Sequence, residues 1–169
     1  MTEDEGLICT GAATAYFNFA LTLIERYGSR ALARCCAKVL LIDPNRTSQA
    51  PYCLDLEKKG HKDAAILKAQ QFMEENYASI IAVDQVAVHV GISSRHFKRR
   101  FKKATSRTPL TYLQNLRIDQ AKKKLESTID SIEEITRHIG YENSSTFRRL
   151  FRQRVCLSPR EYRDKFAQR

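Results

Sequence analysis

The C-terminal part of the chain contains an internal repeat, which limits the possible folds more than any other feature. Residues 83–91 read VDQVAVHVG and align with residues 132–140, which read IEEITRHIG, at an offset of 49. Residues 97–101, FKRRF, align with residues 147–151, FRRLF, at an offset of 50. Stacked repeat architectures need about three or more copies to bury a continuous core. The two copies therefore predict two similar compact modules.

Each copy has the pattern of a helix, a tight turn and a second helix. In the second copy, Ser131 and Glu134 form a capping-box pattern, which starts a helix by pairing its free N–H groups. Apolar residues then recur at helical spacing, and Gly140 follows as a residue suited to the left-handed turn at a helix end. In the first copy, Ser93 or Ser94 is expected to cap the second helix. This succession is the helix-turn-helix pattern.

The second helix of each copy is strongly basic. The chain carries 29 Lys and Arg against 19 Asp and Glu, a net charge of +10. Residues 63–169 hold 21 of the basic and 12 of the acidic residues, whereas residues 1–62 hold 8 and 7. Six basic residues lie within 95–103 and four within 148–154, with no acid in either stretch. A helix fits the major groove of DNA, where Arg and Lys bond to guanine edges and phosphates. The pattern predicts a sequence-specific transcription regulator whose partner is double-stranded DNA.

A linker helix is expected between the two modules. Thr108 is a good helix cap and Pro109 suits the first helical position, and a mostly apolar stripe that includes Leu110 continues to Leu125. About 17 residues at ~1.5 Å each give a helix of roughly 25 Å. Such a helix could hold two recognition helices in adjacent major grooves, about 34 Å apart. The predicted fold class is therefore mainly α, with helix-turn-helix modules at about 83–103 and 132–154 joined by a helix at about 109–126.

Residues 64–166 resemble the DNA-binding domain of the AraC/XylS family of bacterial transcription regulators. The resemblance rests on residues 86–93, on Phe97 and Phe101, on residues 109–125, and on residues 135–163 around the second module. The family commonly has glycine where this chain has Ser106 and Cys156. The resemblance implies that outward residues of the two recognition helices contact DNA. The corresponding residues here are Arg95, Lys98, Arg99, Ser144, Ser145, Thr146, Arg149 and Arg152. Arg100, Lys103 and Arg154 are expected to be simply solvated.

The first 62 residues differ from the rest and are predicted to be a separate domain remnant and linker, preceding a DNA-binding domain at 63–169. The pattern indicates a short strand at 6–10, helices at 12–27 and 30–40, and a linker at 58–61. Residues 8–15 and 41–52 resemble the end of a DJ-1/PfpI-like (glutamine amidotransferase-like) domain, which some AraC-type regulators carry as a sensor. The nucleophilic cysteine of that family has no counterpart here. The strand is expected to remain unpaired, so this part would form a strand-helix-helix remnant of an α/β domain.

Other functional classes find little support in the sequence. The acidic N-terminus is unlike a secretory signal, and no apolar run approaches the roughly 18 residues that span a bilayer, so a cytoplasmic protein without a membrane partner is expected. No nucleophile elbow, catalytic constellation or Cys/His metal pattern is present, so neither an enzyme nor a cofactor or metal site is expected. RNA polymerase is a further candidate partner, while the effector and the oligomeric state stay open. The alternative function is a truncated, non-activating regulator that competes for sites or binds other proteins.

Overall fold

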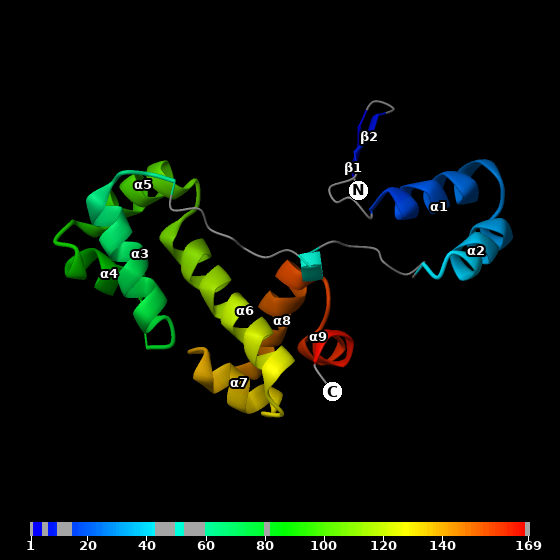
Figure 1. The fold of residues 1–169 in the computed structure, drawn as a ribbon. Helices are drawn as coiled ribbons and strands as arrows, with labels where there is room; N and C mark the ends of the chain where they lie inside the picture. Colours follow the sequence, from blue (N-terminus) through cyan, green and yellow to red (C-terminus); the bar gives the residue numbers. More distant parts are fainter. Residues whose placement is uncertain are drawn as a thin grey trace. The chain divides into compact units, whose positions relative to one another are not determined.

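The computed structural model describes residues 2–4, 7–9, 15–42, 50–52, 60–79 and 82–167 (Figure 1). The chain divides into two compact units, Met1–Cys53 and Leu54–Arg169. The first two residues of the linker expected at 58–61 lie outside the described residues. Within the described residues, no helix has the length and apolar character needed to cross a membrane.

The first unit contains a small hairpin and a pair of helices. Its elements are β1 (Thr2–Asp4), β2 (Leu7–Cys9), α1 (Ala15–Tyr27), α2 (Arg30–Val39) and the short 3-10 helix η1 (Ala50–Tyr52). The two helices pack against each other, with Ala33 and Ala37 of α2 buried. Ser29 caps α2 by accepting a hydrogen bond from the Leu32 N–H at 3.1 Å.

The expectation of an unpaired strand is wrong. Strand β2 pairs antiparallel with β1, in the register Thr2 to Cys9, Glu3 to Ile8 and Asp4 to Leu7. The acidic segment TED has little strand propensity, so the sequence pattern did not indicate β1. Strand pairing satisfies backbone N–H and C=O groups, which every residue of both segments carries.

The second unit begins with a three-helix module. Its helices are α3 (Ala64–Asn76), α4 (Val83–His89) and α5 (Ser94–Thr105). Asp63 caps α3 by accepting a hydrogen bond from the Ile66 N–H at 3.2 Å. The core of this module is formed by Ile66, Met73, Val86, Phe97 and Phe101, which are fully buried, together with Tyr112 from the following helix. The sequence pattern had not singled out α3, which covers one side of this core.

Helix α6 (Pro109–Ser127) leads from the first module into the second (Figure 1). Thr108 and Pro109 begin it as expected, with Thr108 accepting a hydrogen bond from the Thr111 N–H. Its first half packs on the first core through Leu113, and its second half on another core through Leu125. The second module comprises α7 (Ile132–His138), α8 (Ser144–Val155) and α9 (Pro159–Phe166). The predicted fold class, two helix-turn-helix modules joined by a linker helix, is confirmed.

The repeat in the sequence is also a repeat of aromatic packing. In the first module the ring of Phe101 meets the rings of Phe97 and Tyr112 edge-on, at centroid distances of 5.5 and 5.3 Å. In the second, Phe151 meets Phe147 and Tyr162 at 5.5 and 5.6 Å with the same edge-on geometry. Edge-to-face rings at these separations attract each other beyond the area that they bury. Three aromatic residues of the first module and the three residues 50 positions later therefore pack in the same arrangement in their two cores.

Two local expectations need correction. Ser93 occupies the cap position of α5 but its side chain makes no capping hydrogen bond, and the Ser94 hydroxyl donates to Asp84 instead. Leu110 does not join the apolar stripe of α6, since it lies on the first turn with 54% of its surface exposed. Tyr112 and Ile118 are buried on that helix in its place.

Candidate nucleic-acid interface

The turn between the two helices has the same geometry in both modules. After α4, Gly91 has a φ of +68°, and its N–H donates to the Val88 carbonyl while Ile92 N–H donates to Ala87. After α7, Gly140 has a φ of +83° with the equivalent two hydrogen bonds. This double bonding across a left-handed residue is the Schellman helix ending. It directs the chain from α4 into α5 and from α7 into α8, and α5 and α8 are the candidate recognition helices.

The two recognition helices also end alike. Ser106 follows α5 and Cys156 follows α8, and both have a φ of 60°, in the left-handed region. Each donates its backbone N–H to the carbonyl four residues earlier at 2.9 Å. A side chain in this conformation is strained, whereas glycine is not. This geometry explains why glycine suits these two positions.

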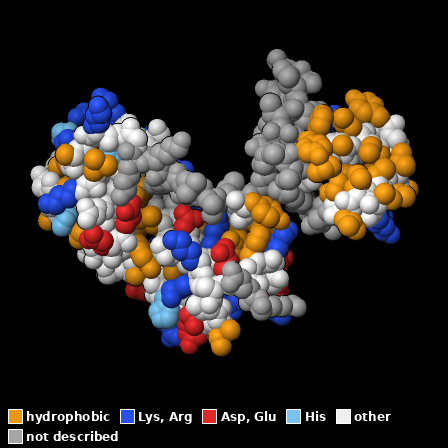
Figure 2. Space-filling view, viewed as in Figure 1, with side chains coloured by type: hydrophobic (Ala, Val, Ile, Leu, Met, Phe, Trp, Pro, Cys, Tyr) orange, Lys and Arg blue, Asp and Glu red, His pale blue; other side chains and the backbone are white. Residues whose placement is uncertain are grey.

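On α5, the three predicted DNA-contacting residues face solvent. Arg95, Lys98 and Arg99 are all exposed, while Phe97 and Phe101 of the same helix are buried. Lys98 forms an ion pair with Asp84 of α4, with the ammonium nitrogen 3.1 Å from a carboxylate oxygen. The hydrogen bonds from Ser94 and Lys98 lower the pKa of Asp84 below its ordinary value. In Figure 2, Lys and Arg side chains gather where α5 lies.

On α8, the predicted residues lie in the first turn, in the middle and in the last turn of the helix. Ser145 and Thr146 are exposed and Ser144 is half-buried, and the backbone N–H groups of Ser145 and Thr146 donate to the Asn143 side chain. Asn143 is thus the cap of α8, a role that the sequence pattern did not assign. Arg149 and Arg152 follow on the exposed part of the helix. The assignment of all eight residues to DNA contact stays a prediction.

An acidic residue faces each recognition helix from the helix before it. Glu133 of α7 accepts a hydrogen bond from Arg148 of α8 at 2.5 Å. This pair is the repeat equivalent of Asp84 and Lys98. Sequence reasoning missed both acids, although their shared position in the repeat was a usable signal. Such exposed pairs contribute little to stability, so each basic side chain remains available to a stronger anionic partner.

The expectation that Arg100 and Arg154 are simply solvated is wrong, whereas Lys103 is exposed. Arg100 donates from Nε to the Asp63 carboxylate at 2.6 Å and thereby ties α5 to the start of α3. This hydrogen bond is the main reason why the pKa of Asp63 is lowered. Arg154 bonds to the side chains of Gln114, at 2.8 Å, and Asn115 on α6. These two arginines hold the recognition helices on the rest of the unit.

The arrangement presents two basic helices at equivalent positions of two similar modules. Within the described part of the chain, no group of three or more His, Cys, Asp or Glu side chains could hold a metal ion. The chemistry that the surface offers is that of Arg and Lys donors and helix-terminal hydroxyls. These groups suit phosphates and base edges in a major groove.

Comparisons with known proteins agree with this geometry. Residues 86–165, from α4 to α9, match a helix-turn-helix domain family. The HTH-type transcriptional regulator ArgR of Pseudomonas aeruginosa is 27% identical over 163 residues, which cover 96% of this chain and 49% of that protein. A solved transcriptional regulator with an AraC-type DNA-binding domain, from Chromobacterium violaceum, is 31% identical with a TM-score of 0.58, over 62% of this chain and 93% of that chain. The DNA-binding domain of AdpA, solved in complex with a target DNA, is 27% identical with a TM-score of 0.58, over 60% of this chain and 92% of that one.

This chain spans 62%, 32% and 49% of the lengths of three curated relatives that it matches. The paired modules, the linker helix and these matches together define a double helix-turn-helix domain. Residues 86–165 form a helix-turn-helix domain of the AraC/XylS family. The resemblance of residues 1–62 to a DJ-1/PfpI-like domain stays a prediction.

Proposed function

We propose that this chain is a sequence-specific DNA-binding transcription regulator that inserts α5 and α8 into adjacent major grooves. The observation that carries the proposal is the duplication of one basic, exposed recognition helix in two equivalent modules. Each helix buries its phenylalanines in its own core and leaves basic side chains exposed: Arg95, Lys98 and Arg99 on α5, and Arg149 and Arg152 on α8. The similarity to a domain solved with its target DNA supports the same reading.

Direct readout is assigned to Arg99 and Arg149, which occupy equivalent positions of α5 and α8. Substitution of either by alanine should weaken binding to the best site by about 1–3 kcal/mol and relax the preference for one base pair. The measurement is a titration of the full chain against a duplex selected from random DNA, repeated with single base-pair changes. Arg34→Ala is the control, since Arg34 is an exposed arginine of α2 in the other unit. If both recognition-helix variants bind all duplexes as the wild type does, the assignment of base contacts is wrong.

Binding should also weaken steeply as salt rises. Each phosphate that the protein neutralises releases condensed counterions, so the logarithm of the affinity falls linearly with the logarithm of the salt concentration. Titrations between about 50 and 200 mM salt should therefore show losses of tenfold or more. An affinity that is independent of salt would contradict an interface built from Lys and Arg.

The remaining sequence expectations extend this proposal. Residues 1–62 would be the end of a DJ-1/PfpI-like sensor domain and residues 63–169 the DNA-binding domain, in a cytoplasmic protein without enzymatic activity. RNA polymerase would be its partner at a promoter. The matches to transcription regulators favour this reading over a competitor or interaction module that no longer regulates transcription. Partial proteolysis that releases a DNA-binding fragment beginning near residue 63 would support the division.

A further inference from the structure

Arg117 lies in the middle of α6, where three segments of the second unit meet. Its Nε donates a hydrogen bond, at 2.9 Å, to the carbonyl oxygen of Tyr77, the cap residue that directly follows α3. Its guanidinium carbon lies 5.0 Å from the centroid of the Tyr141 ring, in the turn between α7 and α8. One half-buried side chain thus contacts a segment of each helix-turn-helix module from the helix that joins them.

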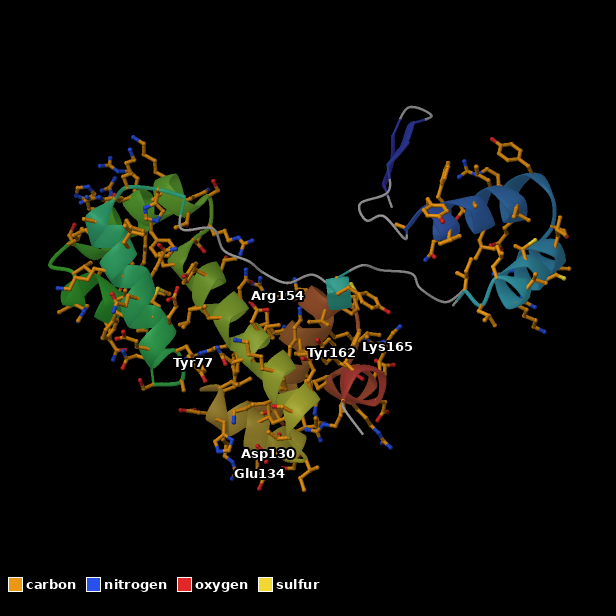
Figure 3. All side chains as sticks on the ribbon, viewed as in Figure 1. Tyr77, Asp130, Glu134, Arg154, Tyr162 and Lys165 are labelled. Carbon is orange, nitrogen blue, oxygen red and sulfur yellow. The ribbon has the colours of Figure 1, made fainter. Side chains whose placement is uncertain are left out.

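Two further contacts bring the same segments together. Tyr77 packs against the apolar cores of both modules, and in Figure 3 it lies at the end of α3 that is nearer to α7. The next residue, Ala78, places its carbonyl oxygen 2.4 Å from the position that a β-carbon on Gly140 would occupy. The end of the first module therefore lies directly against the turn of the second. Only a glycine leaves enough room for this approach.

Arginine has the properties that this junction requires. Its planar guanidinium can donate to a carbonyl within its plane while its face lies over an aromatic ring, and lysine does not combine these two contacts. A charge-assisted hydrogen bond in a partly buried site is stronger than a neutral one. Burial raises the pKa of the Tyr141 hydroxyl, and the nearby charge of Arg117 acts in the opposite direction. Tyr141 therefore stays neutral as a platform for the cation over the physiological range.

If α6 were the sole connection between the two modules, their relative twist would depend on that helix alone. The contacts at Arg117 add a second connection beside α6. We propose that Arg117 is a positioning residue that sets the separation and twist of α5 and α8, and thereby the spacing of the two half-sites that the protein accepts. This inference rests on the proposed function, because spacing has meaning only if both helices enter DNA.

The test compares Arg117→Gln with the wild type on a set of duplexes. The parent duplex is the bipartite site that the wild-type full chain selects from random DNA. Other duplexes carry one or two base pairs inserted or deleted between the half-sites. Each added or removed base pair rotates one half-site relative to the other by about a tenth of a helical turn. A last duplex retains only one half-site. The affinity of the wild type should fall tenfold or more for each spacing change, because two linked modules gain affinity only when both engage. Arg117→Gln should bind the parent site about tenfold more weakly than the wild type does. Its affinities for the different spacings should differ by less than threefold.

Lys123→Gln is the matched control, because it removes one positive charge from an exposed position of the same helix. It should retain the spacing preference of the wild type. Affinity for the single half-site should be the same in Arg117→Gln as in the wild type, which separates positioning from a general loss of folding or charge. If Arg117→Gln does not fold, Arg117→Lys provides the measurement and should discriminate spacings less than the wild type does.

An unchanged spacing profile in a folded Arg117 variant would overturn the inference while leaving the proposed function intact. A wild-type chain that selects no duplex, or only a single half-site, would instead refute the two-groove function on which the inference rests. An equal loss on every duplex, including the half-site, would show that Arg117 serves stability alone and would also overturn the positioning role.

Discussion

Substituting the two turn glycines separately should reveal the contact between the modules. Gly91→Ala and Gly140→Ala place the same side chain at equivalent positions with positive φ, +68° and +83°. The left-handed backbone should cost each about 1–2 kcal/mol, partly offset by about 0.4–1 kcal/mol because alanine has fewer unfolded conformations than glycine. Both changes should therefore destabilise the second unit by about 1 kcal/mol through the backbone alone.

Gly140→Ala should lose additional stability, because its side chain would also clash with a neighbouring segment of the folded protein. No described atom lies within 4 Å of a β-carbon on Gly91, whereas a β-carbon on Gly140 would lie 2.4 Å from the Ala78 carbonyl oxygen and 2.9 Å from two other Ala78 atoms. These neighbours are backbone atoms that cannot rotate away, so the two segments must separate. Overpacking of this kind costs about 1–3 kcal/mol. The total for Gly140→Ala should be about 2–4 kcal/mol.

Urea unfolding followed by circular dichroism measures both variants under the same conditions. The free energy of unfolding should fall at least 1 kcal/mol more for Gly140→Ala than for Gly91→Ala, with a larger shift of the midpoint. The reasoning is refuted if the two variants lose equal stability, because the close approach of Ala78 to the second turn would then have no energetic consequence. A larger loss for Gly91→Ala would equally contradict it.

Two further predictions concern stability. Ser106→Gly and Cys156→Gly should each raise the free energy of unfolding by about 0.5–1 kcal/mol, because the relief of left-handed backbone strain exceeds the entropy cost of glycine. The control is Ala167→Gly, at a helix end with a φ of −63°, which should lower the free energy of unfolding. If all three substitutions stabilise the protein, the conformational explanation is excluded. The hydrogen bond from Arg100 lowers the pKa of Asp63 in the folded protein. The ionised Asp63 carboxylate therefore stabilises the fold at pH values above the unfolded pKa, near 3.8, and this stabilisation is lost as the pH falls through the lower, folded pKa. Asp63→Asn retains a capping side chain and should therefore lose up to about 1 kcal/mol at pH 7 and less at pH 2. Urea unfolding at the two pH values measures the difference, and an equal loss at both would exclude an electrostatic origin.

Much of the fold followed from local sequence signals. The offset of about 50 residues predicted two modules because the same apolar and aromatic positions must face the same kind of core. The Ser131–Glu134 capping box, and Thr108 with Pro109, act within one helical turn, and all are present as predicted. The outward position of Arg99 and Arg149 followed from the same helical periodicity.

The features that differ from the sequence predictions all depend on contacts between separate segments of the chain. Strand β1 exists because it pairs with β2, a backbone interaction that side-chain patterns do not encode. Arg100 and Arg154 are engaged because Asp63, which caps α3, and Gln114 on α6 lie beside them only in the folded unit. A basic residue on a recognition helix therefore appears solvated in the sequence until its neighbours in space are known.

The sequence by itself determined the modules, their order, the helix between them and the basic character of both recognition helices. These properties depend on periodicity, capping and charge over short stretches of chain, which residue types alone specify. The tertiary structure alone decided how the modules meet, through Arg117, Tyr77 and the turn at Gly140. Tyr77 and Arg117 are 40 positions apart in the sequence, and a contact at that separation depends on the packing of the elements between them.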